Sequence, residues 1–220
     1  MLRQVKILAI FWLLGFVTSA LAESRPSDNA QLRVFVVEDA AISGRTLLEA
    51  ERDAGRVFRM AGVDVSWVTC ERRVPLSNMH CLDDAQNSDL ILRIVPNART
   101  YTSEVFGVSF LDEVGQGTYA DVFLTPIQQM TALDRELSLD AILGDVIAHE
   151  LGHLLLGNHA HSVQGIMRAR WQADQLHGLS AGRLFFTTDQ AAQLRNNVRS
   201  LRKRGSPLVV AEVGTFNHAQ

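Results

Sequence analysis

The chain has 220 residues, of which 47% are hydrophobic and 20% are charged, and its formal net charge is −3. This length is enough for one domain with a substantial hydrophobic core. The mildly acidic balance argues against a charge-driven nucleic-acid binder.

The N-terminus has the pattern of a secretory signal peptide. Arg3 and Lys6 precede the apolar run 7–17, and Ala20-Leu21-Ala22 is a small-residue cleavage site. The alternative is a retained membrane anchor, although the run is short for a membrane-spanning helix. We expect cleavage after Ala22 and export to the periplasm or the extracellular space, with no membrane span in the remaining chain.

Residues 23–220 are expected to form one domain, with a polar tail from about residue 205. Alternating or continuous apolar runs predict strands and 3.6-residue periodicity predicts helices. In chain order, the expected elements are a strand at 32–37, a helix at about 43–61, a strand at 63–68, a loop at 71–87, strands at 90–95, 107–110 and 118–124, and helices at 139–156 and about 188–201. Pro126 is expected to end the last strand. This order predicts an α+β fold with a mixed sheet and at least one parallel strand pair.

Cys70 and Cys81 are the only two cysteines. In an exported protein, such a pair most often forms a disulfide that closes a loop. A pair of metal ligands or a reactive thiol is the alternative, and His80 beside Cys81 keeps it open. The sequence therefore predicts a Cys70–Cys81 disulfide.

The most informative motif is His149-Glu150-Leu151-Gly152-His153, late in a long apolar helix. Residues at i and i+4 lie on one helix face, so His149 and His153 can bind one metal ion. Glu150 is then placed to act on a metal-bound water, as in the H-E-x-x-H motif of zinc hydrolases. The alternative is a helix whose histidines are ordinary core or surface residues.

Residues 149–167, HELGHLLLGNHAHSVQGIM, resemble the metzincin clan of zinc endopeptidases, whose pattern is H-E-x-x-H-x-x-G-x-x-H followed by a Met-turn. His159 lies where that pattern has its third ligand, but the glycine stands at 157 instead of 156. The stretch is also similar to predicted bacterial secreted metalloproteases that read HE[LI]GHLLLG, then HS and GIM, in which the recurring histidine falls on His161. We place the third ligand at His161, with His159 as the alternative. Met167 is the expected Met-turn residue, a hydrophobic floor beneath the metal.

The resemblance implies a metzincin-like fold. Its features are a mostly parallel twisted sheet with an antiparallel edge strand, a backing helix, an active-site helix, a Met-turn and a C-terminal helix. Residues 117–123 resemble the edge strand above a matrixin cleft, where an extended substrate pairs through its backbone; a plain amphipathic strand is the alternative. Where matrixins carry a structural-metal histidine in that strand, this chain has Asp121, and no cysteine-switch propeptide is visible. The resemblance therefore implies no latency mechanism, calcium site or second zinc site for this chain.

The function that we predict is a secreted zinc metalloendopeptidase that hydrolyses peptide bonds. Glu150 is the predicted general base, and His149, His153 and His161 are the predicted Zn²⁺ ligands. The alternatives are a zinc hydrolase of non-peptide amides, such as those of cell walls, and a non-catalytic zinc-binding interaction domain. The sequence indicates neither the cleavage preference nor the oligomeric state.

Overall fold

The structure is a computed structural model, and it describes residues 29–70, 80–98, 105–158, 160–171, 176–178 and 181–203. The predicted signal peptide and the polar tail lie outside the described residues. In chain order the elements are β1 (Ala30–Glu38), α1 (Gly44–Met60), β2 (Val63–Cys70), the short 3₁₀ helix η2 (His80–Leu82), β3 (Leu90–Val95), β4 (Gly107–Phe110), β5 (Tyr119–Phe123), α2 (Leu124–Leu133), α3 (Leu139–Leu156) and α5 (Thr188–Lys203).

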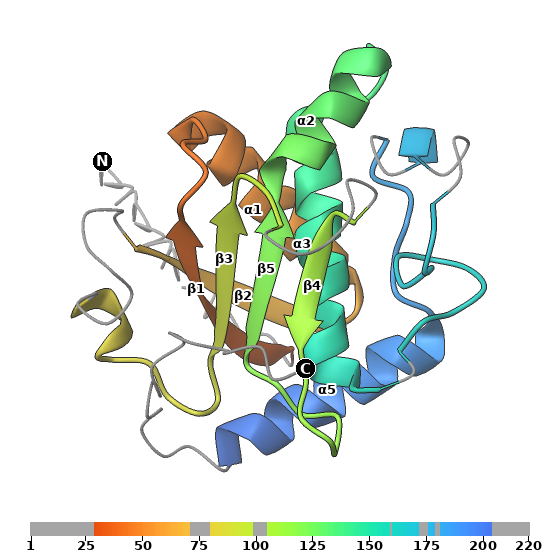
Figure 1. Cartoon of the computed structure of the whole chain (residues 1–220). Helices are drawn as coiled ribbons and strands as arrows, with labels where there is room; N and C mark the ends of the chain where they lie inside the picture. The colour runs from red at the N-terminus through yellow and green to blue at the C-terminus, as the bar shows by residue number, and fades with distance from the viewer. Residues whose placement is uncertain are drawn as a thin grey trace, which may run out of the picture.

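The five strands form one sheet in the order β2-β1-β3-β5-β4 (Figure 1). The pairs β1–β2, β1–β3 and β3–β5 are parallel, and β4 is antiparallel to β5. The predicted α+β fold, with a mostly parallel sheet and an antiparallel edge strand, is confirmed. The identity of the edge strand was predicted wrongly, because β5 lies between β3 and β4 and the edge is β4. Asp121 is accordingly in an inner strand, paired with Arg93 of β3 and Val108 of β4.

One face of the sheet is covered by α1 and α3 (Figure 1). Alternate residues of β1 point to opposite faces, as the pleat requires, so that Val34 and Val36 belong to the main core with the helices. Phe35 and Val37 belong to a smaller cluster on the other face. α3 is apolar on nearly all sides, and residues 141–152 are buried throughout. A helix of that composition is stable only when it is surrounded by protein, and α3 therefore forms the centre of the domain.

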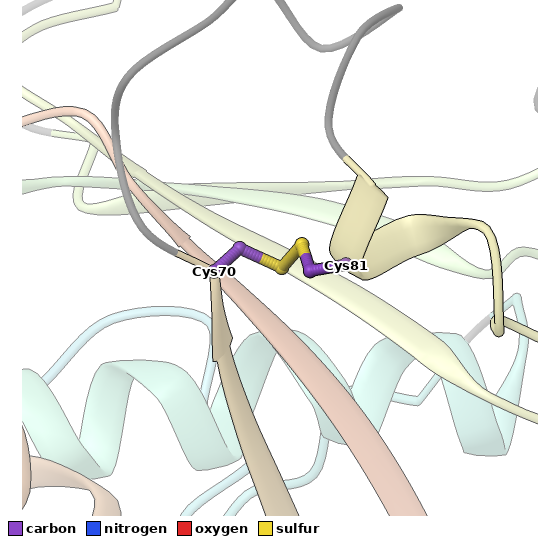
Figure 2. Close-up of a disulfide and its surroundings, with 2 residues drawn as sticks. All are labelled: Cys70 and Cys81. Carbon is purple, nitrogen blue, oxygen red and sulfur yellow. A yellow bond between two sulfur atoms is a disulfide. The ribbon is translucent and has the colours of Figure 1, made fainter.

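The second face of the sheet is covered by the segment that the disulfide attaches. Cys70 ends β2 and Cys81 lies in η2, and their sulfur atoms are bonded (Figure 2). Leu82 and Ala85, just after the disulfide, pack against the strands in the smaller cluster. The predicted disulfide is confirmed, and its two sulfurs are not metal ligands.

The helix α2 was not predicted from the sequence. Pro126 was expected to end a strand, but it is the third residue of α2, directly after β5. The first turn of a helix has backbone N–H groups without intrahelical partners, so a proline there removes no hydrogen bond. No helix among the described residues is long and apolar enough to cross a membrane.

Candidate metal centre and active site

Three histidine rings meet at the C-terminal part of α3. The Nε2 atom of His153 lies 3.1 Å from the Nε2 of His149 and 3.1 Å from the Nε2 of His161. Among the described residues, these three side chains form the one group that could bind a metal ion. His149 and His153 come from consecutive turns of α3, whereas His161 comes from the loop that follows the helix. His159, the alternative third ligand, lies outside the described residues.

The spacing and protonation of the rings suit a zinc ion. Nitrogen ligands at about 2.0–2.1 Å from a tetrahedral zinc are separated from one another by about 3.3 Å, close to the observed spacing. The Nδ1–H of His149 donates to the carbonyl oxygen of Ile166, 2.8 Å away, so that the Nε2 of the neutral ring carries a free lone pair. Three nitrogen donors also leave a fourth position of a tetrahedral zinc open for water or substrate.

The electrostatic environment keeps the rings of His149 and His153 neutral. Burial lowers the pKa of His149 to about 4, against the opposing effect of its hydrogen bond to the Ile166 carbonyl. Burial also lowers the pKa of His153 to about 3, and the neighbouring His149 and His161 lower it further. Neutral imidazole is the form that binds a metal ion.

The turn after α3 explains the displaced glycine of the motif. Gly157 caps the helix with φ 78° and ψ −160°, a conformation that is essentially confined to glycine. Its N–H donates to the His153 carbonyl at 2.9 Å. A Cβ on Gly157 would lie 2.9 Å from the carbonyl oxygen of Gly115, in the β4–β5 turn. The glycine therefore ends the helix where the chain passes that turn, and the loop then leads back to His161.

Met167 follows the loop that carries His161 and is fully buried. Its sulfur packs against α3 at Gly152, where a Cβ would lie only 2.6 Å from it. The Met167 carbonyl accepts a hydrogen bond of 2.8 Å from the Ser162 N–H, which closes the loop that carries His161. Met167 thus packs against the helix that bears His149 and His153, and the carbonyl of the preceding residue, Ile166, orients His149.

Glu150 lies beside the histidines and faces the edge strand. The residue is 7% exposed, and its Oε2 accepts a hydrogen bond of 2.7 Å from the Ser109 hydroxyl. Burial raises the pKa of Glu150 to about 7, and the hydrogen bond from Ser109 opposes this rise. A Cβ on Gly107 would lie 2.6 Å from the Glu150 Cγ, so β4 can approach the carboxylate this closely only with glycine there.

These side chains line a cavity of about 830 Å³. Its walls are β4 with the residues before it, helix α2, and residues 168–171. Helix α3 supplies His149, His153 and Glu150, and the loop after α3 supplies His161. The Trp171 ring stands edge-on to the His149 ring, with centroids 5.4 Å apart. Ser109, Trp171 and the α2 wall were missed in the sequence, because no local motif marks a residue whose role comes from a contact with a distant segment.

A further buried carboxylate, which the sequence analysis did not single out, precedes His149 by one helical turn. Asp145 is 1% exposed, and within the described part of the chain neither of its oxygens has a hydrogen-bond partner. Burial raises its pKa to about 8, with Arg56 lowering and Asp53 raising it. Such a group should make the stability of the protein depend on pH.

We expect Asp145→Asn to flatten that pH dependence. Between pH 6 and pH 8 an unfolded Asp is ionised, whereas folded Asp145 keeps its proton up to about pH 8. The folded state then binds more protons, so the free energy of unfolding falls as the pH rises. The decrease in the free energy of unfolding between pH 6 and pH 8 should be smaller in the variant than in the wild type by about 2 kcal/mol. Urea denaturation in EDTA measures the free energy of unfolding at each pH. Asp83→Asn, at an exposed position, is the control. An equal dependence of this free energy on pH in Asp145→Asn and in the wild type would contradict the expectation.

No protein-family model matches the chain, and no curated protein sequence matches it. Among solved structures, it is similar to a zinc-dependent peptidase from Methanocorpusculum labreanum, with 18% identity and a TM-score of 0.48 over 73% of this chain and 99% of that one. The archaemetzincin of Methanopyrus kandleri has 16% identity and a TM-score of 0.46 over 78% and 98% of the two chains. Metalloproteinase-II from Bacteroides fragilis has 12% identity and a TM-score of 0.46 over 79% and 55%. At identities and TM-scores this low, these similarities transfer neither activity nor metal to this chain.

Proposed function

We propose that this protein is an exported zinc metalloendopeptidase of the metzincin type. The observation that carries the proposal is the meeting of three imidazoles with a buried carboxylate, Glu150, in one cavity beside the edge strand β4. In this proposal His149, His153 and His161 hold Zn²⁺. Bound zinc would polarise the scissile carbonyl and lower the pKa of a water molecule toward about 7.

A side chain of the protein transfers the proton during hydrolysis. Glu150 accepts a proton from the attacking water and later delivers it to the leaving amine. The hydrogen bond from Ser109 orients the carboxylate and favours its ionised form. The outer edge of β4 supplies backbone groups to which an extended peptide can pair as an added strand.

The cavity supports a peptide substrate over a small non-peptide amide. It follows residues 105–109, which are the start of the edge strand β4 and the two residues before it, and this is the extended surface that a peptide chain requires. The buried and hydrogen-bonded Glu150 supports catalysis over mere zinc binding, because a binding domain has no use for a base. The proposal that the protein is exported rests on the predicted signal peptide of residues 1–22.

The direct test uses purified protein with measured zinc content, incubated with a mixed library of unlabelled peptides and analysed by mass spectrometry. We expect internal peptide bonds to be cleaved, and we expect chelation to stop cleavage and added zinc to restore it. Cell-wall fragments with non-peptide amides are tested in parallel. Zinc-loaded protein that cleaves only those fragments, or nothing, would contradict the proposal.

We expect Ser109→Ala to shift the pH profile. Loss of the hydrogen bond should raise the pKa of Glu150, so less of the carboxylate is ionised at a given pH. The acidic limb of kcat/KM should therefore move to higher pH, with a loss of about 3–10-fold below neutrality. Thr69→Val is a matched control, because the Thr69 hydroxyl also bonds a buried glutamate, Glu51, away from the site. An unchanged acidic limb would remove Ser109 from the proposed mechanism.

A further inference from the structure

Residues 168–171, which directly follow Met167 in the chain, form one wall of the cavity, and two of them are arginines. Arg168 is half-buried, Arg170 is exposed, and both line the cavity together with Trp171. Because Trp171 stands against the His149 ring, this wall lies directly beside the three histidines. Neither arginine has a hydrogen bond or an ion pair with another residue in the described ranges, so both guanidinium groups can meet a ligand.

The cavity is positively charged in an acidic protein. The whole chain has a formal net charge of −3, yet Glu150 is the only acidic side chain among the described residues that line the cavity. Two arginines, Arg168 and Arg170, against one carboxylate, Glu150, leave the lining with a formal excess of one positive charge. A bound divalent metal would add to the positive charge. A cleft with one sign of charge attracts and selects ligands of the other sign.

The direction of the cavity indicates which part of a peptide lies in it. From Glu150, which contacts Gly107 and Ser109, the cavity extends toward Val105, Phe106 and helix α2. A peptide that adds antiparallel to β4 runs opposite to that strand, so its C-terminal part lies along the N-terminal part of β4. Residues after the scissile bond therefore occupy the larger part of the cavity.

We propose that Arg168 and Arg170 select peptides that carry a carboxylate on the C-terminal side of the scissile bond. This inference rests on the proposed peptidase function. Guanidinium groups bind carboxylates through paired N–H donors, and Arg is the residue best suited to that contact. The carboxylate can come from an acidic side chain within a longer peptide or from the free C-terminus of a short one.

The test compares matched peptides that differ at one of the first three positions after the cleaved bond. Each position carries Glu, Gln or Lys, and a separate pair of short peptides has either a free C-terminal acid or a C-terminal amide. At low salt we expect kcat/KM to be about 5–10-fold higher for Glu than for Gln at the responsive position, and lower still for Lys. High salt should reduce the preference. The acid–amide pair shows whether the C-terminus is the source.

The double variant Arg168→Gln/Arg170→Gln should reduce the preference to under about 2-fold, mainly through a higher KM for the acidic peptide. Any loss of kcat/KM for the Gln peptide should be smaller than the loss for the Glu peptide, so the ratio of the two values is the readout. Arg45→Gln is the matched control, because Arg45 is an exposed arginine on α1 that does not line the cavity, and it should keep the full preference.

Binding separates this inference from the peptidase proposal. The affinity of uncleaved Glu and Gln peptides is measured on the zinc-loaded Glu150→Gln protein with and without the two arginine substitutions. Cleavage of both peptides at equal rates, with equal affinities, would overturn the charge selection while leaving the peptidase intact. A preference for Glu that survives the double variant would also overturn it. Zinc-loaded protein that neither cleaves nor binds any peptide would overturn both.

Discussion

Glu150→Gln should leave zinc bound and reduce kcat by about a thousandfold, within the range expected for loss of a general base. Glutamine has nearly the same shape and can still accept the hydrogen bond from Ser109, but its amide cannot take up a proton. Because Glu150 is not one of the three clustered nitrogen donors, the metal content should not change. The measurements are peptide cleavage under saturating substrate and zinc stoichiometry by atomic absorption.

The chain offers a closely matched control for this substitution. Glu51 of α1 has the same 7% exposure as Glu150, and burial raises the pKa of both carboxyl groups. Each also lies near a hydroxyl group, that of Thr69 for Glu51. Glu51→Gln should therefore reproduce the effect on packing without the loss of kcat. Full activity in Glu150→Gln, or an equal loss in Glu51→Gln, would remove Glu150 as the base.

His161→Ala should lose tightly bound zinc and, with it, all measurable cleavage. The Nε2 of His161 is one of three nitrogens in the cluster, and two imidazoles of α3 alone do not hold zinc as three do. We expect zinc affinity to fall by at least about a hundredfold, which a competition titration with a chromophoric chelator measures. The thermal stabilisation that zinc gives the wild type should fall in parallel, because binding to the folded state stabilises it.

His159→Ala is the decisive comparison, since His159 is the alternative ligand. It should keep wild-type zinc affinity if His161 is the ligand. His177→Ala is a neutral control, because His177 pairs with Asp134 at 3.0 Å and is not part of the cluster. Loss of zinc in His159→Ala, with retention in His161→Ala, would assign the third position to His159.

Much of the fold was predictable because its signals are local. The alternation in β1 and β2, the periodicity of α1 and the apolar length of α3 each reflect the burial of one segment, and the observed elements match within a few residues. The α2 helix and the identity of the edge strand were not predictable in this way. Proline is compatible with both a strand end and a first helical turn. An inner strand and an edge strand of similar composition differ only in what pairs with them.

The local part of the site was also readable from the sequence. Helical geometry alone puts His149 and His153 on one face, with Glu150 beside them, wherever α3 lies in the protein. The isolated cysteine pair likewise predicted its own disulfide. In both cases the reacting residues are close in the sequence, so the local chain geometry places them together.

Only the tertiary structure brought the ring of His161 to the other two histidines. Its position depends on the turn at Gly157, which passes the β4–β5 turn, and on the hydrogen bonds that Ile166 and Met167 make. The contact of Ser109 with Glu150 and the arginine-bearing wall likewise join segments far apart in the chain. The sequence by itself determined the α3 motif and its chemistry, because helical periodicity is local. The meeting of the His161 ring with the other two, the orienting hydroxyl and the charge of the cleft depend on packing between segments, which helical periodicity alone does not record.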